Sequence, residues 1–590
     1  MRARHSLLPA VVAPALALAL ASPRAQPADT LNRSWRQLTT DAFTVVAEGN
    51  DGRVREIAEK VDAFRAAVHE VFPAARLEPL VPTTVVVFSP AGFNSFKPLS
   101  GGRRQDWVGG YALSAGDATL LVMGYGGHPA STYGLVFHEY MHEILARTFP
   151  VMPHWYNEGV AELFGAFAGT ASDGRAVIGR PIQHRLDSVR ADGLLPLRDM
   201  LNSASAAKWQ RELPSRFYAS AWLMAHYFLM DPERRRGLLS LLTELTTGAD
   251  VDSAVQKTFG MTVDGMTASL TNYARRSTLP VLLPPAPPVS DRASTVLRMT
   301  DRQVANLHAD LLLRIGDVDG ADDLLKKAVA RFPDDDGLRT AVARLRLAQD
   351  RAPDALTVLA TASEPRSVDS LRAEADALRQ SGRLPDAADR LARAATSRTP
   401  SPLLLFELGR VHMAQANWAE ATAAFTRLRV LDARAGWDLS RAYEAFRLGY
   451  GVYTASAARA YLAKVGWSEP SSPYAAFAGV LGLWRDKRQD EATALLADVT
   501  KATTGAKWPA PIVAFLNGRL PAPGLIDAAT SDGERTEAHA YVGLVASIDG
   551  RRDDAIEHLT WVKTRGERQY VEYGWATAEL ERLVTKPPVP

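Results

Sequence analysis

The stretch Tyr133-Gly-Leu-Val-Phe-His-Glu-Tyr-Met-His-Glu-Ile-Leu-Ala-Arg-Thr-Phe149 contains the motif His-Glu-x-x-His. The segment is largely apolar and ends just before Pro150, so we expect it to form a helix. Residues four apart on a helix share a face, and His138 and His142 can therefore direct both imidazoles at one metal ion. Glu139 is placed to accept a proton from a water molecule bound to that ion. At the residue frequencies of this chain, chance would produce such a motif only ~0.01 times.

Two histidines do not complete such a site, because a catalytic zinc ion usually takes three protein ligands and keeps a fourth position open. A third histidine at the spacing of the longer His-Glu-x-x-His-x-x-Gly-x-x-His motif is excluded, because that position is Thr148. A second helix is instead expected from Trp155, with Glu158 and Glu162 one turn apart. This pattern predicts that Glu158 binds the metal and that Glu162 braces a ligand imidazole. The alternative, with Glu162 as the ligand, stays open.

These two segments resemble the gluzincin superfamily of zinc metallopeptidases, in which a second helix supplies the glutamate ligand. Trp155-Tyr-Asn-Glu-Gly-Val-Ala161 resembles the aminopeptidase N type and the peptidase MA-like domains, and the likeness covers about 131–278. It implies that His138, His142 and Glu158 are zinc ligands and that Glu139 is the general base. The Gly-x-Met-Glu-Asn element with which aminopeptidases recognise a free N-terminus does not precede the zinc helix, so aminopeptidase activity is not implied. Imidazole and carboxylate also accept other divalent metals.

Peptide hydrolysis further needs a donor to the tetrahedral oxyanion. In gluzincins a tyrosine or histidine well downstream supplies it, and Arg216-Phe-Tyr-Ala-Ser-Ala-Trp222 begins a helical pattern in that region. We expect Tyr218 to be the donor. The alternatives are His226 and an ordinary structural role for Tyr218. Arg216 is expected to pair with a carboxylate or substrate, or to be solvated.

Three other features near the motif are weaker candidates. His128, in the loop before the zinc helix, is a candidate for the cleft, and His154 is expected to be structural. The strand 118–123 is expected to offer an exposed edge to an extended substrate.

The N-terminus has the pattern of a secretory signal peptide. Arg2 and Arg4 precede an apolar run, and Ala19-Leu-Ala21 is a small-x-small cleavage site, with cleavage after Ala25 as the alternative. We therefore expect a signal peptide at 1–21 and a periplasmic or extracellular product with no membrane span after cleavage.

The composition limits the class of protein. With 47% hydrophobic and 23% charged residues in a chain of 590, the protein is expected to be globular. A net charge of +2 argues against nucleic-acid binding through global charge. The absence of cysteine excludes disulfides, thiolate zinc sites and a cysteine nucleophile.

The rest of the chain divides into three regions. Residues 30–278 are expected to form an α+β metallopeptidase domain, a small sheet with active-site helices, with strands at 43–47, 83–88 and 118–123 and a helix at 54–71. The proline-rich segment 279–293 is expected to be a stiff linker. Residues 294–590 are expected to form an all-α solenoid.

That last region repeats with a period near 34, because the alanines Ala321, Ala355, Ala387 and Ala421 are 34, 32 and 34 residues apart. A fifth unit is expected at Ala555, with weaker ones near Ala492 and within 436–465. The period and the small residues resemble the tetratricopeptide repeat, whose concave face binds peptides or proteins. The segment 508–580 also resembles periplasmic tetratricopeptide lipoproteins of the envelope-scaffold type, without their lipid-bearing cysteine.

These observations lead to one main hypothesis and one alternative. The main hypothesis is an exported zinc metallopeptidase that hydrolyses protein or peptide substrates and uses the repeat array to bind substrate or a partner. The alternative is a tetratricopeptide adaptor or scaffold of the cell envelope, with a weakly active or gated peptidase-like domain.

Overall fold

The computed structural model describes most of the chain. The described residues are 33–100, 103–106, 108–125, 129–149, 152–167, 176–246, 249–283, 295–363, 366–396, 400–467, 469–503, 505 and 507–585. The predicted signal peptide, His128 and the greater part of the predicted linker 279–293 lie outside this set. Among the described residues, no helix combines the length and the apolar character needed to cross a membrane.

The structure forms two compact units. The first contains the described residues of Val12–Asn202 and Lys208–Asp432, and the second contains Ser203–Ala207 and the described residues from Ala433 onward. The first unit therefore includes both the region of the His-Glu-x-x-His motif and the first helical repeats. The domain boundaries expected at 278 and 294 stay a prediction.

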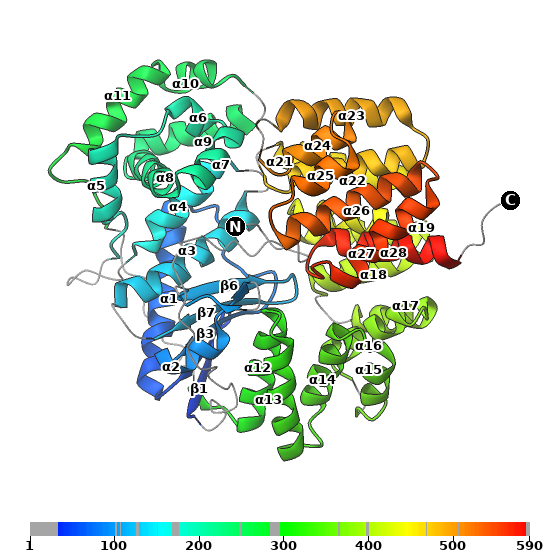
Figure 1. Cartoon of the computed structure of the whole chain (residues 1–590). Coiled ribbons are helices and arrows are strands. Elements are labelled where there is room, and N and C mark those ends of the chain that lie inside the picture. The colour runs from blue at the N-terminus through cyan, green and yellow to red at the C-terminus, as the bar shows by residue number, and fades with distance from the viewer. Residues whose placement is uncertain are drawn as a thin grey trace. The chain divides into compact units, whose positions relative to one another are not determined.

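A six-stranded mixed sheet lies in the first unit, with strand order β6-β7-β3-β2-β1-β8. Strands β6, β7, β3 and β1 of this sheet are labelled in Figure 1. Its strands are β1 (Trp35–Thr39), β2 (Thr44–Glu48), β3 (Thr83–Phe88), β6 (Gly110–Ser114), β7 (Thr119–Gly124) and β8 (Leu297–Arg298). Strand β3 runs parallel to both of its neighbours, β2 and β7, and the other pairings are antiparallel. The three strands expected from β-branched runs are confirmed, whereas β1 and β6 have shorter apolar patterns and were not predicted.

Small elements complete this part of the chain. A separate two-stranded ladder joins β4 (Leu99–Ser100) and β5 (Arg103–Arg104), beside α2 (Pro90–Phe93) and a 3-10 turn (Asn94–Phe96). Strand β7 is paired on both sides, with β6 and β3, so the expectation that it offers a free edge is wrong. The edge strand on this side is β6.

The two faces of the sheet are covered by different helices. Side chains alternate along a strand, so Val85, Val87 and Leu121 lie on the face opposite Val86 and Val122. Val86 and Val122 belong to a core that also contains Leu311 and Leu312 of α12 (Asp301–Arg314). Helices α1 (Asp51–Val71) and α3 (Pro129–Thr148) contact the strands as well. The sheet is thus a layer between helices.

Further helices surround α8 in the first unit. Helix α8 (Pro214–Leu229) is buried along nearly its whole length and contacts α4 (His154–Gly165), α5 (Gln183–Asp192), α9 (Pro232–Thr246) and α11 (Val263–Ala274). Helices α6 (Leu197–Leu201) and α10 (Val251–Phe259) also belong to this unit, as does the part of α7 (Ser203–Glu212) from Lys208 onward. Because α8 contacts α4, its position helps to fix the residues that follow Pro153 in the chain.

The repeat region consists of antiparallel helix pairs. In the first unit the pairs are α12 with α13 (Val318–Arg331), α14 (Asp336–Ala348) with α15 (Ala352–Leu359), α16 (Val368–Gln380) with α17 (Leu384–Ala394), and α18 (Pro402–Ala414) with α19 (Trp418–Leu431). In the second unit they are α20 (Gly436–Leu448) with α21 (Gly451–Val465), α22 (Ser472–Arg485) with α23 (Gln489–Ala502), and α26 (Asp532–Ile548) with α27 (Arg552–Arg565). The short helices α24 (Ala510–Leu516) and α25 (Ala522–Asp527) precede α26, and α28 (Val571–Thr585) follows α27.

One backbone feature explains the period of the repeat. Each of these pairs turns through a residue with positive φ two positions before its second helix, and these residues are Gly316, Asp350, Gly382, Ala416, Gly449, Lys487 and Gly550. The alanines five positions later, Ala321, Ala355, Ala387, Ala421, Ala492 and Ala555, are all buried. Small side chains there let the two helices of a pair pack closely, as predicted. The expected weaker units also form helix pairs.

Candidate metal centre

Helix α3 is amphipathic in the way its sequence predicts. One face is buried in the core and consists of Tyr133, Val136, Phe137, Tyr140, Met141, Ile144 and Leu145, at helical spacing. His138 and His142 lie on another face and are partly exposed. The apolar face packs the helix into the fold and leaves the two imidazoles at its side.

Glycines bring α3, α4 and α8 into close contact. A Cβ atom on Gly134 would come within 2.7 Å of the Gly165 carbonyl oxygen, and one on Gly159 within 2.2 Å of the Ala221 carbonyl oxygen. Real Cβ atoms do not approach backbone atoms so closely, so these positions require glycine. This packing sets the distance between the two imidazoles on α3 and the carboxylates on α4.

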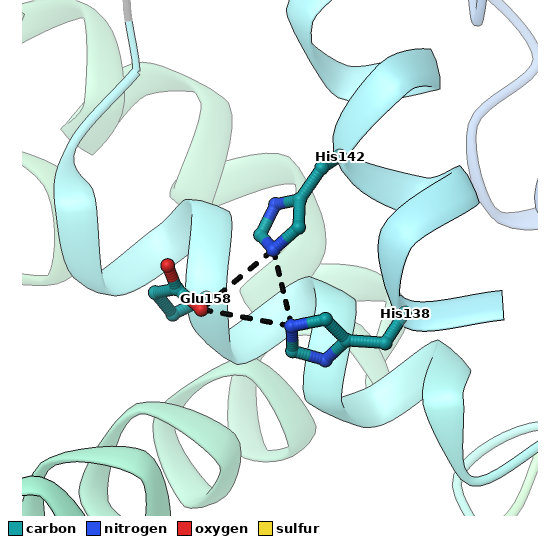
Figure 2. Close-up of side chains that lie close together, drawn as sticks. All are labelled: His138, His142 and Glu158. Carbon is teal, nitrogen blue, oxygen red and sulfur yellow. Dashed lines mark hydrogen bonds and ion pairs between the residues drawn. The ribbon is translucent and has the colours of Figure 1, made fainter. Parts of the chain in front are cut away.

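The structure brings His138, His142 and Glu158 together, with their ligand atoms within 4.8 Å of one another (Figure 2). The two Nε2 atoms lie 3.1 Å apart, and each lies 3.7 Å from the Glu158 Oε2 atom. A tetrahedral zinc ion with bonds near 2.1 Å holds its ligand atoms about 3.4 Å apart. The donor set and its spacing therefore fit a divalent ion such as zinc. It is the one such group found among the described residues.

Each histidine is oriented by its second nitrogen. The Nδ1 atom of His142 lies 3.0 Å from the Asn157 side-chain oxygen, which fixes Nδ1–H as the donor and leaves Nε2 free to bind a metal. His138 hydrogen-bonds to the backbone of Ala161. Burial, the neighbouring His142 ring and the Arg185 guanidinium hold the pKa of His138 well below its usual range, so its imidazole is neutral, as a ligand must be.

The carboxylates of α4 occupy different places. Glu158 is 2% exposed and directs Oε2 towards the two Nε2 atoms. Glu162 lies on the far side of the His138 ring, with Oε1 3.9 Å from Nδ1, and accepts two hydrogen bonds from Arg185, at 2.9 and 3.1 Å. In this arrangement Glu158 is the residue placed to bind a metal, and Glu162 faces the back of the ligand ring.

Glu139 is partly buried on α3. Desolvation of its carboxyl group, with the negative charges of Glu158 and Glu143, raises its pKa to about 7, against the opposing effect of His142. The Glu139 carboxyl group thus interacts electrostatically with two of the three residues of the cluster, His142 and Glu158.

Tyr218, on α8, is linked to the cluster through Gln210 of α7. The Gln210 amide donates to the Tyr218 hydroxyl at 2.9 Å and approaches the Glu158 Oε1 atom at 3.4 Å, while its oxygen lies 2.6 Å from His154 Nε2. Burial and the nearby Glu158 raise the pKa of Tyr218, so its hydroxyl keeps its proton. The Arg185 guanidinium lies over the Tyr218 ring, 5.2 Å from its centre.

The structure also places three other residues that the sequence analysis singled out. His226 is fully buried and lies 2.8 Å from both the Tyr273 hydroxyl and the Gly179 carbonyl oxygen, so both its nitrogens are engaged away from the cluster. Arg216 donates to the Asp192 carbonyl oxygen at 2.9 Å, at the end of α5, a contact that the sequence did not predict. His154, expected to be structural, orients Gln210.

Sequence reasoning missed Asn157, Gln210 and Arg185 as members of the site. Asn157 could have been found, because it directly precedes Glu158 in a pattern already singled out. Gln210 and Arg185 lie 52 and 23 positions from their partners on α4, on helices without any motif, and no signal in the sequence marks them.

Comparison with known proteins concerns the repeat region. The tetratricopeptide repeat family matches residues 312–374, from the end of α12 into α16. The chain is 12% identical to a tetratricopeptide repeat protein from Parabacteroides merdae, over 47% of this chain and 98% of that one, with a TM-score of 0.31. It is 15% identical to pilF of Pseudomonas aeruginosa, over 46% of this chain and 96% of that one, with a TM-score of 0.21. No curated protein matches the chain.

A third solved structure is matched over a larger share of this chain. The chain is 15% identical to a chain of the Cut9–Hcn1 hetero-tetramer of the APC/C, over 77% of this chain and 75% of that one, with a TM-score of 0.30. The family match, with the helix pairs, supports a tetratricopeptide-type repeat region. Such repeats bind protein partners, so the comparisons favour the protein-interaction alternative over the peptidase. They do not bear on catalysis.

Proposed function

We propose that this chain is a metal-dependent peptidase joined to a protein-binding repeat array. One observation supports this proposal more than any other: the Nε2 atoms of His138 and His142 and the Glu158 Oε2 atom converge at distances of 3.1 and 3.7 Å. A purely adaptor protein has no use for such a group of ligands beside Glu139, which lies in the same helix as both histidines.

The residues would divide the chemistry between them. His138, His142 and Glu158 would hold a divalent cation, with zinc proposed because two imidazoles and a carboxylate suit it. Such a cation makes a water molecule far more acidic and polarises a substrate carbonyl group. Glu139 accepts the proton of the attacking water and returns it to the leaving amine. Tyr218, which keeps its proton, donates a hydrogen bond to the oxyanion of the tetrahedral intermediate.

A chelator and one conservative variant test the proposal. The full-length protein should cleave an unfolded protein such as casein, and a zinc chelator should abolish this cleavage until zinc is restored. Glu139→Gln should lower kcat by at least ~100-fold and retain its metal, because general acid–base catalysis contributes 10²–10⁴-fold. Glu59→Gln, an exposed position of α1, is the matched control and should cleave as the wild type does.

The metal content gives a second measurement that does not depend on finding a substrate. Elemental analysis of the purified protein should show one divalent ion per chain, and its identity decides between zinc and other metals. His142→Ala and Glu158→Gln should each lose that ion. A wild-type protein that binds no divalent metal, even after incubation with zinc, would rule out the proposed peptidase.

The second candidate function is a protein-interaction adaptor, and the family match at 312–374 favours it. If this candidate is correct, the full-length protein should show no chelator-sensitive cleavage and should still bind a defined protein partner. Both candidates include export to the periplasm or the outside of the cell as a proposal, which N-terminal sequencing of the mature protein checks by showing whether residues 1–21 are removed.

A further inference from the structure

The turn between β6 and β7 contacts the helical repeats. The turn is closed by a hydrogen bond of 3.2 Å from the Ala115 amide to the Ala118 carbonyl oxygen, and Gly116 adopts a left-handed conformation with φ of 76°. Its tip therefore consists of Gly116 and Asp117, which lie past the end of β6 and before the start of β7.

Two arginines of the repeats bind the Asp117 carboxylate. Arg314, on α12, donates to both of its oxygens, at 3.0 and 3.1 Å, and Arg372, on α16, donates to Oδ2 at 3.0 Å. The Asp117 side chain is 15% exposed. Burial alone would raise its pKa, but the two guanidinium groups hold the pKa of Asp117 well below its usual range. Forked arginine–carboxylate pairs of this kind are among the strongest hydrogen-bonded contacts in proteins.

A third helix holds the backbone of the turn. The Leu403 amide, in the first turn of α18, donates to the Gly116 carbonyl oxygen at 3.0 Å. Amides in the first turn of a helix have no partner within the helix, so this one is available for an outside acceptor. The turn thus binds the first helices of three of the four pairs in this unit.

The arginines are themselves held in place by acidic residues of the repeats. Arg372 donates to both Glu407 oxygens, at 2.9 and 2.8 Å, and Arg314 donates to Asp310 at 2.8 Å. Asp310 also accepts from Arg344 at 2.6 Å. Because Arg344 lies 34 positions after Asp310 and Glu407 35 after Arg372, the repeat period aligns these side chains along one face. The two cationic groups are therefore also held by contacts that do not involve the turn.

We infer that this face of the first four helix pairs is a binding site for an acidic turn, and that the chain fills it with its own Asp117 turn. The repeats would thereby hold the edge strand β6 in register beside α3. Strand β6 contacts α3, where a Cβ on Gly110 would lie 3.6 Å from Leu135, three positions before His138. Any effect of this contact on the metal centre rests on the proposed function, whereas the contact's role in keeping β6 in register does not.

Hydrogen exchange in the full-length protein tests this inference. In Asp117→Asn, the amides of β6 and the Leu403 amide should exchange at least ~10-fold faster than in the wild type, while the β2 amides keep their protection. Arg314→Lys, which loses the forked contact but keeps the charge, should show the same pattern more weakly. Asp386→Asn removes an exposed aspartate that pairs with Arg383 on the adjoining α17 turn, and as the matched control it should leave β6 unchanged.

The two proposals fail in different ways. Wild-type exchange of β6 and Leu403 in both Asp117→Asn and Arg314→Lys would overturn the inference. If Asp117→Asn loses the protection of β2 as well, Arg314→Lys decides alone. Glu139→Gln should keep wild-type exchange in β6, because its carboxyl group takes no part in the contact. The wild type could lack peptidase activity and bound metal while the Asp117→Asn and Arg314→Lys variants still show accelerated β6 exchange. That combination would refute the proposed function and support this inference.

Discussion

Gly159 lies so close to Ala221 that a Cβ atom on Gly159 would come within 2.2 Å of the Ala221 carbonyl oxygen. This contact joins α4, which carries Glu158, to α8, which carries Tyr218. Gly159, the residue after Glu158, therefore determines how closely the two helices can approach. That approach in turn sets the positions of the proposed metal ligand and the proposed oxyanion donor.

The first prediction concerns this contact. Gly159→Ala should lower the free energy of unfolding by about 1–3 kcal/mol, because backbone atoms must move to admit the methyl group. It should also weaken zinc binding, since Glu158 moves with α4. Denaturant titration and a competitive zinc assay measure the two effects. Gly574→Ala, in α28 with no atom within 4 Å of the new Cβ, should instead be neutral or stabilising by up to ~1 kcal/mol. Equal behaviour of the two variants would contradict the packing argument.

The second prediction concerns the orientation of a proposed ligand. Asn157→Ala removes the oxygen 3.0 Å from His142 Nδ1 and should weaken zinc affinity about 10–100-fold, because the ring loses its fixed tautomer and orientation. Titration against a chromophoric chelator measures the change. Asn306→Ala, in which the lost amide donates to Asp335 within the repeats, should bind zinc as the wild type does. Unchanged affinity in Asn157→Ala would show that Asn157 has no orienting role.

The third prediction concerns pH and a buried carboxyl group of the second unit. Glu572 is fully buried near Glu537, and burial and this neighbouring charge raise the pKa of Glu572 well above its usual range. At pH values between the pKa of Glu572 in the unfolded chain and its raised pKa in the folded protein, the folded state binds a proton that the unfolded state has lost. Stability should therefore fall as pH rises from about 4.5 towards the raised pKa, by up to about 1.4 kcal/mol per pH unit.

Glu572→Gln checks this sign, because the variant cannot lose a proton there. Its stability should fall less steeply with pH over the same range and should exceed that of the wild type at the alkaline end. Chemical denaturation at several pH values, followed by tryptophan fluorescence, provides the measurement. Glu581→Gln, exposed on the same helix, should retain the wild-type slope. A wild type whose stability rises with pH across this range would contradict the assignment.

The fourth prediction concerns the turns within the repeats. Ala416 has a φ of 57°, at the position where other pairs have Gly316 and Gly382. A side chain in the left-handed region costs about 1–2 kcal/mol, so Ala416→Gly should raise the free energy of unfolding by about 1 kcal/mol. Ala423→Gly, at an exposed position inside α19, should lower it by about 1 kcal/mol. Thermal unfolding of both variants therefore distinguishes an effect of the local backbone conformation from a general effect of replacing alanine by glycine.

The elements that local patterns could predict are those with strong periodicity. Helix α3 was predictable because its apolar residues recur at helical spacing, and the same periodicity placed His138 and His142 on one face. The helix pairs were predictable because small residues return with the repeat. Strand β6 was not, since its five residues include Gly110 and Ser114 and show no alternation strong enough to distinguish it from a loop.

Local spacing therefore predicted which side chains could bind a metal and which segments would pair as repeats, because both depend on spacings of a few residues within a helix. The structure was needed to show that Glu158 and not Glu162 lies beside both Nε2 atoms, that Gln210 links Tyr218 to Glu158, and that Asp117 lies between Arg314 and Arg372. Those relationships depend on how closely separate helices approach, which glycine contacts and buried ion pairs fix and which no local pattern records.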